Sequence, residues 1–282
     1  MEYKYPSKEI LETNSKEIAN EEKYYNLSEM LDEKEADLKL SIPVGKDADN
    51  EYIFMDLKKV SGFLITGETG SGKSVYLNSI IISLLLKNSP EELQFLFMDP
   101  TKVEFSKYFN ISHNLLSSSK TDYIKVQLKT LCDELKKRKE LFKKSSVKTI
   151  DDYNEKNDKK LPHMIYIINE IEQAFNSETF NNYMLTILED GYKYGIHIIL
   201  GTSSYLNDSF DKKVLDSFKY IMSFDLADKK IARFISLKGA DLLSVCGDAL
   251  IRKKKDTPYN IQTPYVSEKD INNIINEVNK NI

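Results

Sequence analysis

The phosphate-binding pattern G-x-x-x-x-G-K-[ST] is present in this chain as Gly67-Glu68-Thr69-Gly70-Ser71-Gly72-Lys73-Ser74. An apolar run over residues 63–66 precedes it and predicts a buried strand, and residues 75–86 follow it and predict a helix. This strand–loop–helix context is the one in which the pattern binds phosphate. Small residues are needed because backbone N–H groups must close around phosphate oxygens, and the start of the helix adds unpaired N–H donors.

The loop therefore predicts an ATP site with Mg²⁺. The binding residues are expected to be Gly67, Glu68, Thr69, Gly70, Ser71, Gly72, Lys73, Ser74 and Val75. Lys73 is expected to reach the outer phosphates, and the Ser74 hydroxyl to ligate Mg²⁺. The simpler alternative is a loop of glycine and serine that binds nothing. All four fixed positions in the expected context argue against that alternative.

The composition is that of a protein with a sizeable core. The 282 residues are 41% hydrophobic and 11% aromatic, enough for one large domain or two modest ones. The formal charge is −4, and residues 1–40 hold 11 acidic and 6 basic side chains, so the remainder is near neutral. This balance neither suggests nor excludes nucleic acid, because binding depends on clustered cations.

No targeting or metal-binding pattern is apparent. Residues 1–6 lack the apolar region of a signal peptide, and no apolar run approaches the ~18 residues of a membrane span. Cys132 and Cys246 form no C-x-x-C pair, and His113, His163 and His197 share no metal-site spacing. We expect reduced thiols, structural histidines and a cytoplasmic location.

Apolar runs alternate with helical patterns along the chain. A strand pair is expected within residues 38–57, and buried strands at 93–98, 164–168, 196–200, 220–224 and 249–251. Helical spacing predicts a helix over 121–144 capped by Thr121, and a last helix capped by Ser267. The pattern predicts an α/β fold with a doubly wound, mainly parallel sheet flanked by helices. We expect an acidic lead-in over residues 1–38 and one domain over 39–282.

The strand over residues 164–168 supplies the second half of the predicted site. A P-loop ATPase needs a carboxylate near Mg²⁺ and a group that activates water, both at the end of a strand beside the P-loop strand. The strand here ends in Asn169-Glu170. Glu170 is the candidate catalytic carboxylate, together with Lys73, and Asn169 is the candidate metal-site residue with Ser74. An amide oxygen brings no negative charge, so Mg²⁺ would be held less firmly.

Ordered blocks of sequence lie before and after the P-loop. They are Tyr25-Asn26-Leu27-Ser28-Glu29-Met30-Leu31, Ile42-Pro43-Val44-Gly45-Lys46-Asp47, residues 67–79, Asp99-Pro100-Thr101-Lys102-Val103-Glu104-Phe105, Ile111-Ser112-His113-Asn114-Leu115-Leu116, Asp152-Tyr153-Asn154-Glu155-Lys156, Gly195-Ile196-His197-Ile198-Ile199-Leu200 and Gly239-Ala240-Asp241. Together they resemble the motor domain of the FtsK/SpoIIIE DNA translocases over roughly residues 25–280. The resemblance implies a RecA-like fold and ATP-driven movement of double-stranded DNA through a ring, usually a hexamer.

The chain departs from that family's pattern at several positions. Asn169 stands where the family has Asp, and Tyr192 where it has a trans-acting arginine, with Lys193 nearby. The family's Thr-Gln-Arg-Pro loop reads Thr202-Ser203-Ser204-Tyr205. The family's smaller α subdomain, its winged helix and its membrane-spanning segment have no counterpart in these residues. We therefore expect a stripped-down relative.

The candidate DNA contacts follow from the same resemblance. Lys229 and Arg233 match the family's pore-loop cations, with Lys230 beside them. The run Arg252-Lys253-Lys254-Lys255 is a further candidate, with a solvated hairpin edge as its alternative. The run Lys136-Lys137-Arg138-Lys139 is expected to be a solvated helix face.

Three functions remain open at this stage. The first is a DNA translocase with slow hydrolysis, because losing a transition-state arginine costs orders of magnitude in rate. The second is a nucleotide-dependent scaffold that forms a ring, alone or with a related active subunit, and hydrolyses little. The third keeps the superfamily and resembles conjugative coupling proteins or type VII secretion ATPases.

Overall fold

A computed structural model of the chain describes residues 3–12, 25–32, 38–171, 174–203 and 210–280. Within them, ten strands form one sheet in the order β2-β1-β10-β9-β8-β3-β7-β6-β4-β5. Their bounds are β1 Ser41–Lys46, β2 Tyr52–Asp56, β3 Gly62–Thr66, β4 Leu93–Met98, β5 Asn114–Ser118, β6 His163–Asn169, β7 Ile196–Thr202, β8 Tyr220–Ser223, β9 Asp248–Lys253 and β10 Tyr259–Gln262. The six strands from β8 to β5 pair in parallel, and the other pairings are antiparallel.

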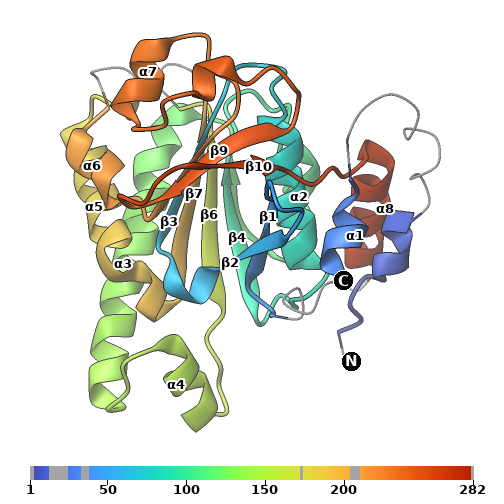
Figure 1. Ribbon diagram of the computed structural model, residues 1–282. Coiled ribbons are helices and arrows are strands. Elements are labelled where there is room, and N and C mark those ends of the chain that lie inside the picture. The colour runs from blue at the N-terminus through green and yellow to red at the C-terminus, as the bar shows by residue number, and fades with distance from the viewer. Residues whose placement is uncertain (1–2, 13–24, 33–37, 172–173, 204–209, 281–282) are drawn as a thin grey trace.

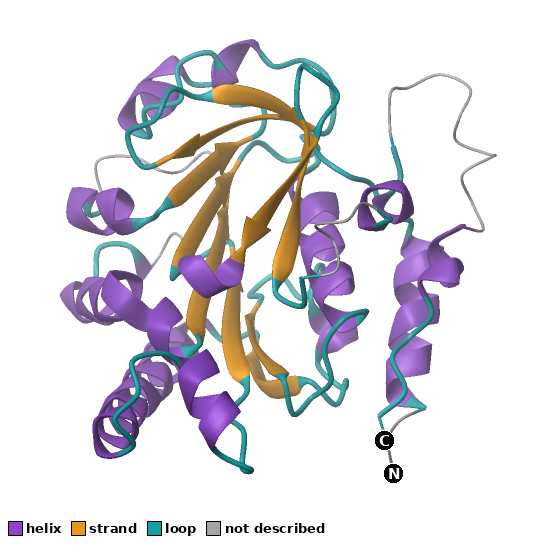
Figure 2. Cartoon of the chain, turned by 60° about the horizontal axis from the view of Figure 1, so that its bottom comes forward, coloured by secondary structure: helices purple, strands orange, loops and turns teal. Residues whose placement is uncertain are grey.

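Helices cover both faces of this sheet (Figures 1 and 2). The α-helices are α1 Leu27–Leu31, α2 Lys73–Leu85, α3 Ile124–Lys144, α4 Ile150–Lys156, α5 Glu178–Asp190, α6 Lys212–Ser217, α7 Lys229–Phe234 and α8 Glu268–Asn279, and short 3₁₀ turns include η1 Lys8–Glu12, η5 Thr121–Tyr123 and η7 Gly191–Tyr194. In Figure 1, α2, α1 and α8 lie on one side of the sheet, and α3, α5 and α6 on the other. This is the RecA-like, doubly wound arrangement that the sequence predicts.

The two faces of the sheet bury separate apolar clusters. Along β3, Phe63 and Ile65 pack with α2, whereas Leu64 packs with α3 and α5. Successive side chains of a strand point to opposite faces, so a strand covered on both faces is apolar throughout. Leu27 and Leu31 of α1 join the α2 cluster, so the described part of the lead-in packs against the sheet. The domain boundary at residue 38 stays a prediction.

Several local expectations need correction. Thr121 is the first residue of η5 rather than a helix cap, and α3 begins at Ile124 without a side-chain cap. Arg138 is buried on α3, where it donates to Glu134 and to the Tyr194 carbonyl, so this run is not a wholly solvated face. The strands β5 and β10 were not expected. The other expected strands and the Ser267 cap are confirmed.

Candidate nucleotide-binding site

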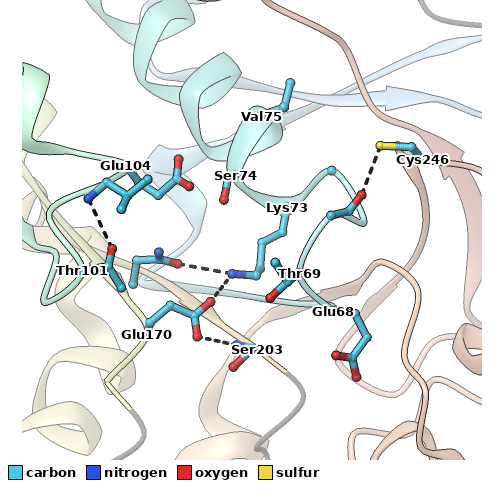
Figure 3. Close-up of a pocket in the computed structure, with 14 residues that line it drawn as sticks. Glu68, Thr69, Lys73, Ser74, Val75, Thr101, Glu104, Glu170, Ser203 and Cys246 are labelled. Atoms are coloured by element: carbon cyan, nitrogen blue, oxygen red, sulfur yellow. Dashed lines mark hydrogen bonds and ion pairs between the residues drawn. The ribbon is translucent and has the colours of Figure 1, made fainter.

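The P-loop lies at the carboxyl end of the parallel strands, between β3 and α2. Beside it is a cavity of about 550 Å³ (Figure 3). Its lining is Glu68, Thr69, Gly70, Gly72, Lys73, Ser74, Val75, Thr101, Val103, Glu104, Asn169, Glu170, Ser203 and Cys246. In an open parallel sheet, ligands bind at this edge because the loops that follow neighbouring strands converge there. The cavity therefore joins the P-loop to the ends of β4, β6 and β7.

The conformation of the loop depends on glycine and on contacts with neighbouring loops. Gly72, which precedes α2, has a φ of 105°, where an L side chain is strained. A Cβ there would lie 2.9 Å from the backbone nitrogen of Gly247. That nitrogen donates to the Ser71 carbonyl at 3.1 Å, and the Glu68 nitrogen donates to the Asp225 carbonyl at 2.8 Å. The loop is thus held by the segments that precede β9 and follow β8.

Lys73 and Glu170 contact each other in the cavity, as Figure 3 shows. Lys73 is 5% exposed, and its Nζ forms an ion pair with Oε1 of Glu170 and lies 3.5 Å from Oδ1 of Asn169. The second carboxylate oxygen of Glu170 accepts from the backbone nitrogen of Ser203 at 3.1 Å. A buried ammonium group needs such a partner, because desolvation of an unpaired charge costs several kcal/mol. The structure thus brings the two predicted catalytic residues into contact.

Asn169 and Ser74 are the candidate metal-site residues. Asn169 is buried at the last position of β6, opposite Gly201 of β7, and Ser74 lies in the first turn of α2. Both side chains line the same cavity. Among the residues that the structure describes, no three His, Cys, Asp or Glu side chains gather into a metal-binding set. Oxygen donors suit Mg²⁺, which keeps several waters and is usually bound through one or two carboxylates together with phosphate oxygens.

Five lining residues were not predicted from the sequence as site residues, and one of them, Ser203, directly follows β7. Thr101, Val103 and Glu104 follow β4, and Cys246 precedes β9. Thr101, Val103 and Glu104 could have been found from the rule that strand ends converge, because they follow the strand expected at residues 93–98 of the same parallel sheet. Cys246 carried no such signal. Its Sγ lies 3.5 Å from the Gly70 carbonyl oxygen, a contact that only the tertiary fold creates.

A smaller cavity of about 170 Å³ adjoins the first. It shares Gly72, Val75 and Cys246 with it, and Gly247, Thr263, Pro264 and Tyr265 complete its lining. Aromatic, proline and aliphatic surface beside a phosphate loop is suited to a planar, mostly apolar ring.

The candidate DNA contacts lie at the same edge of the sheet. Lys229, Lys230 and Arg233 are exposed on the six-residue helix α7. Lys229 is 3.9 Å from the carboxylate of Asp241. The loop between β8 and α7 contacts the P-loop, because the Ala227 nitrogen donates to the Glu68 side chain at 3.4 Å.

The run Arg252-Lys253-Lys254-Lys255 divides into two parts. Arg252 is 7% exposed, and its Nε donates to the Ile235 carbonyl at 2.9 Å, so it is neither a solvated edge nor a DNA contact. The three lysines are exposed where β9 ends and the turn to β10 begins.

Tyr192 and Lys193 lie at the opposite edge from the P-loop. They belong to η7, which precedes β7, and the Tyr192 nitrogen donates to Oγ of Ser61 at 3.0 Å. Neither residue can therefore reach the cavity of its own chain. Ser204 and Tyr205 lie outside the described residues.

The three histidines are buried, and each contacts a neighbouring segment of the chain. Nδ1 of His163 lies 3.1 Å from Nε2 of His197, whose Nδ1 is 2.7 Å from the Val60 carbonyl. Burial lowers the pKa of both imidazoles, to about 4 for His197. His113 makes a similar contact with the Asn88 carbonyl at 2.8 Å.

Among the helices that the structure describes, none combines the length and the hydrophobicity that a membrane span requires.

Known proteins similar to this chain include DNA translocases. The chain is 32% identical to the DNA translocase FtsK of Leptospira interrogans over 255 residues, which is 86% of this chain and 27% of that protein. It is 30% identical to the DNA translocase SftA of Bacillus subtilis over 250 residues, 85% of this chain and 26% of that protein. The chain thus spans about a quarter of these relatives.

Solved structures show the same fold. The conjugation coupling protein TcpA of pCW3, determined with ATPγS, superposes with a TM-score of 0.76 at 25% identity, over 93% of this chain and 75% of that one. ATPases 2 and 3 of EssC from Geobacillus thermodenitrificans superpose with a TM-score of 0.70 at 21% identity, over 86% of this chain and 48% of that one. The profile of the FtsK/SpoIIIE family matches residues 26–218. With the P-loop, Lys73 and Glu170 in place at the strand ends, this match makes the chain a member of the FtsK/SpoIIIE family.

Proposed function

We propose that this chain binds ATP with Mg²⁺ and acts as a subunit of an ATP-driven motor that moves double-stranded DNA. The observation that carries the proposal is the contact between Lys73 and Glu170 in a cavity of about 550 Å³ whose wall is a P-loop. This geometry provides a phosphate cradle, a cation and a carboxylate in one place. Membership of the FtsK/SpoIIIE family supports DNA as the substrate.

The residues divide the work of binding and hydrolysis. The backbone N–H groups of the loop and of the first turn of α2 would hold the phosphates. Lys73 would exchange its ion pair with Glu170 for the outer phosphates, which leaves the Glu170 carboxylate able to orient water and accept its proton. Bound Mg²⁺ would neutralise phosphate charge, and Ser74 and Asn169 are the residues that would hold it. The adenine ring would lie in the 170 Å³ cavity against Tyr265.

Slow hydrolysis is part of this proposal. Asn169 carries no charge, and Tyr192 has no group that neutralises a transition state. Lys193 lies at the amino end of the sheet, so it would assist only the site of a neighbouring subunit. We therefore propose a ring, of this chain alone or with a related active subunit, in the cytoplasm where ATP and DNA are present.

DNA would be contacted by α7. The exposed Lys229, Lys230 and Arg233 suit phosphate contacts, which give affinity that falls steeply with salt and little base preference. The link from Glu68 to Ala227 joins this helix to the nucleotide loop.

The test is steady-state ATP hydrolysis with and without duplex DNA. The Lys73→Ala variant provides the control for the P-loop, and Glu170→Gln tests the proposed base. Turnover that DNA stimulates and that both substitutions abolish is the expected result. Turnover that survives Lys73→Ala would refute the assignment of the site.

A second candidate is a nucleotide-dependent scaffold with little turnover. The uncharged Asn169 beside an otherwise complete phosphate loop favours it. ATP binding that drives oligomerisation without hydrolysis would support the scaffold, and brisk DNA-stimulated turnover would exclude it. The likeness to TcpA keeps a conjugative role within the same proposal, because such a role also uses DNA as cargo.

A further inference from the structure

The loop after β4 is held by one buried carboxylate. Asp99 is fully buried, and its oxygens accept from the Thr101 hydroxyl at 2.6 Å and from the backbone nitrogens of Lys102, Glu104 and Phe105 at 3.1, 3.0 and 2.8 Å. A carboxylate that satisfies several backbone donors fixes the turn that carries them.

The other side of this loop is anchored by an aromatic ring. Phe105 is fully buried, and its ring centroid lies 5.6 Å from that of Phe97 on β4. Glu104 therefore sits between a buried carboxylate and a buried ring, so its backbone position is set by the core rather than by the loop.

The side chain of Glu104 enters the nucleotide cavity. It lines that cavity with Ser74, and Figure 3 shows its carboxylate turned toward Ser74. Glu170, by contrast, is occupied by Lys73 and by the Ser203 nitrogen. Within the described part of the chain, the Glu104 carboxylate has no ion pair or hydrogen bond. It is thus an available negative charge beside the hydroxyl expected to bind Mg²⁺.

The site otherwise lacks charge at the metal position. Ser74 and Asn169 offer a hydroxyl and an amide oxygen, both neutral, whereas Mg²⁺ in nucleotide sites is usually held by one or two carboxylates as well as by phosphates. The oxygen donors of Ser74 and Asn169 fit Mg²⁺, but neither residue supplies a carboxylate. Glu170 cannot fill the role while it serves as the base.

We propose that Glu104 supplies the carboxylate of the Mg²⁺ site that Asn169 lacks, either by direct ligation or through a metal-bound water. The inference rests on the proposed binding of Mg²⁺–ATP. Asp99 is the positioning residue that presents Glu104 to the site.

The test measures the Mg²⁺ requirement of nucleotide binding, without turnover. A fluorescent, non-hydrolysable ATP analogue is titrated onto the full chain at increasing Mg²⁺ and in EDTA. Glu104→Gln should raise the half-saturating Mg²⁺ concentration about tenfold, the range typical of a lost carboxylate near a metal. Affinity in EDTA should be unchanged or tighter, and binding there shows that the variant is folded. Glu140→Gln, an exposed acid on α3, is the matched control and should leave the midpoint unchanged.

A second substitution separates metal binding from simple repulsion. Asn169→Asp in the Glu104→Gln background should bring the Mg²⁺ midpoint back toward that of the unmodified chain. A carboxylate that only repels phosphate would instead give tighter nucleotide binding at every Mg²⁺ concentration when removed, and that result would overturn the inference. So would an unchanged midpoint in Glu104→Gln. If the unmodified chain binds no nucleotide at any Mg²⁺ concentration, the proposed function fails and this inference with it.

Discussion

The contact between the P-loop and the segment before β9 can be tested with two alanines. Gly72 and Gly70 both have positive φ, 105° and 85°, so either substitution places an L side chain in a strained backbone region. The two positions differ in their surroundings. A Cβ at Gly72 would lie 2.9 Å from the Gly247 nitrogen, whereas a Cβ at Gly70 would have no atom within 4 Å. Gly70→Ala is therefore the matched control for Gly72→Ala.

The expected magnitudes follow from this difference. Backbone strain of about 1–3 kcal/mol is common to both variants. Gly72→Ala must also displace the Gly247 backbone, which costs about 1–3 kcal/mol as overpacking and about 1 kcal/mol for the hydrogen bond from Gly247 to Ser71. The free energy of unfolding of Gly72→Ala should thus fall below that of Gly70→Ala by roughly 2–4 kcal/mol. In a chain of this size that is a difference in Tm of about 10 °C.

The assay is thermal and urea unfolding of both variants in EDTA without nucleotide. These conditions remove any contribution from ligand binding, which would otherwise stabilise the two variants unequally. Equal losses of stability in the two variants would refute the reasoning, because the segment around Gly247 would then move aside with no loss of folding free energy.

Three further predictions concern other parts of the molecule. Maleimide should label the exposed Cys246 first, and saturating nucleotide should slow this labelling, whereas Cys132, whose thiol pKa burial raises to about 11, should react slowly in either case. Mass spectrometry distinguishes the two cysteines, and a labelling rate of Cys246 that does not change with nucleotide would contradict the proposed site. Burial lowers the pKa of His197 from 6.5 to about 4, so its contribution of roughly 3 kcal/mol to the free energy of unfolding is present above pH 6.5 and is lost as the pH falls toward 4. Urea unfolding measured at a series of pH values should show this loss of stability, and the loss should be smaller in His197→Gln. Lys230→Ala should lower the slope of log binding constant against log salt concentration for DNA by about one, and Lys137→Ala on α3 should leave it unchanged. Equal slopes for the two variants in fluorescence anisotropy titrations would exclude α7 as the DNA contact.

Much of the nucleotide site could be predicted because it depends on short-range pattern. The P-loop places its glycines, Lys73 and Ser74 within eight residues, and Asn169-Glu170 follows a fully apolar strand. The rule that parallel strand ends converge then brings both stretches together. The residues of each stretch are close in sequence, and the fold only had to bring the two stretches side by side.

Other features depended on contacts that no local pattern carries. The edge strand β5 and the inner strand β10 were missed because their sequences, Asn114-Leu115-Leu116-Ser117-Ser118 and Tyr259-Asn260-Ile261-Gln262, lack a continuous buried run. Arg138 was assigned to solvent because its neighbours are lysines. Its position could have been recognised, since Leu131, Leu135 and Phe142 place the same stripe of α3 toward the interior.

Glu170 has two oxygens with different partners, and this division links the phosphate site to the neighbouring strand β7. One oxygen meets Lys73, and the other accepts the backbone N–H of Ser203, directly after β7. If Lys73 turned to a phosphate, as proposed, the carboxylate would lose this cation, and the hydrogen bond from Ser203 would meet a less neutralised charge. A hydrogen bond to an unneutralised carboxylate is stronger and shorter than one to a carboxylate in an ion pair. Nucleotide binding would therefore tighten the hydrogen bond that Ser203, at the end of β7, donates to Glu170, so that the proposed base would also respond to occupancy of the site.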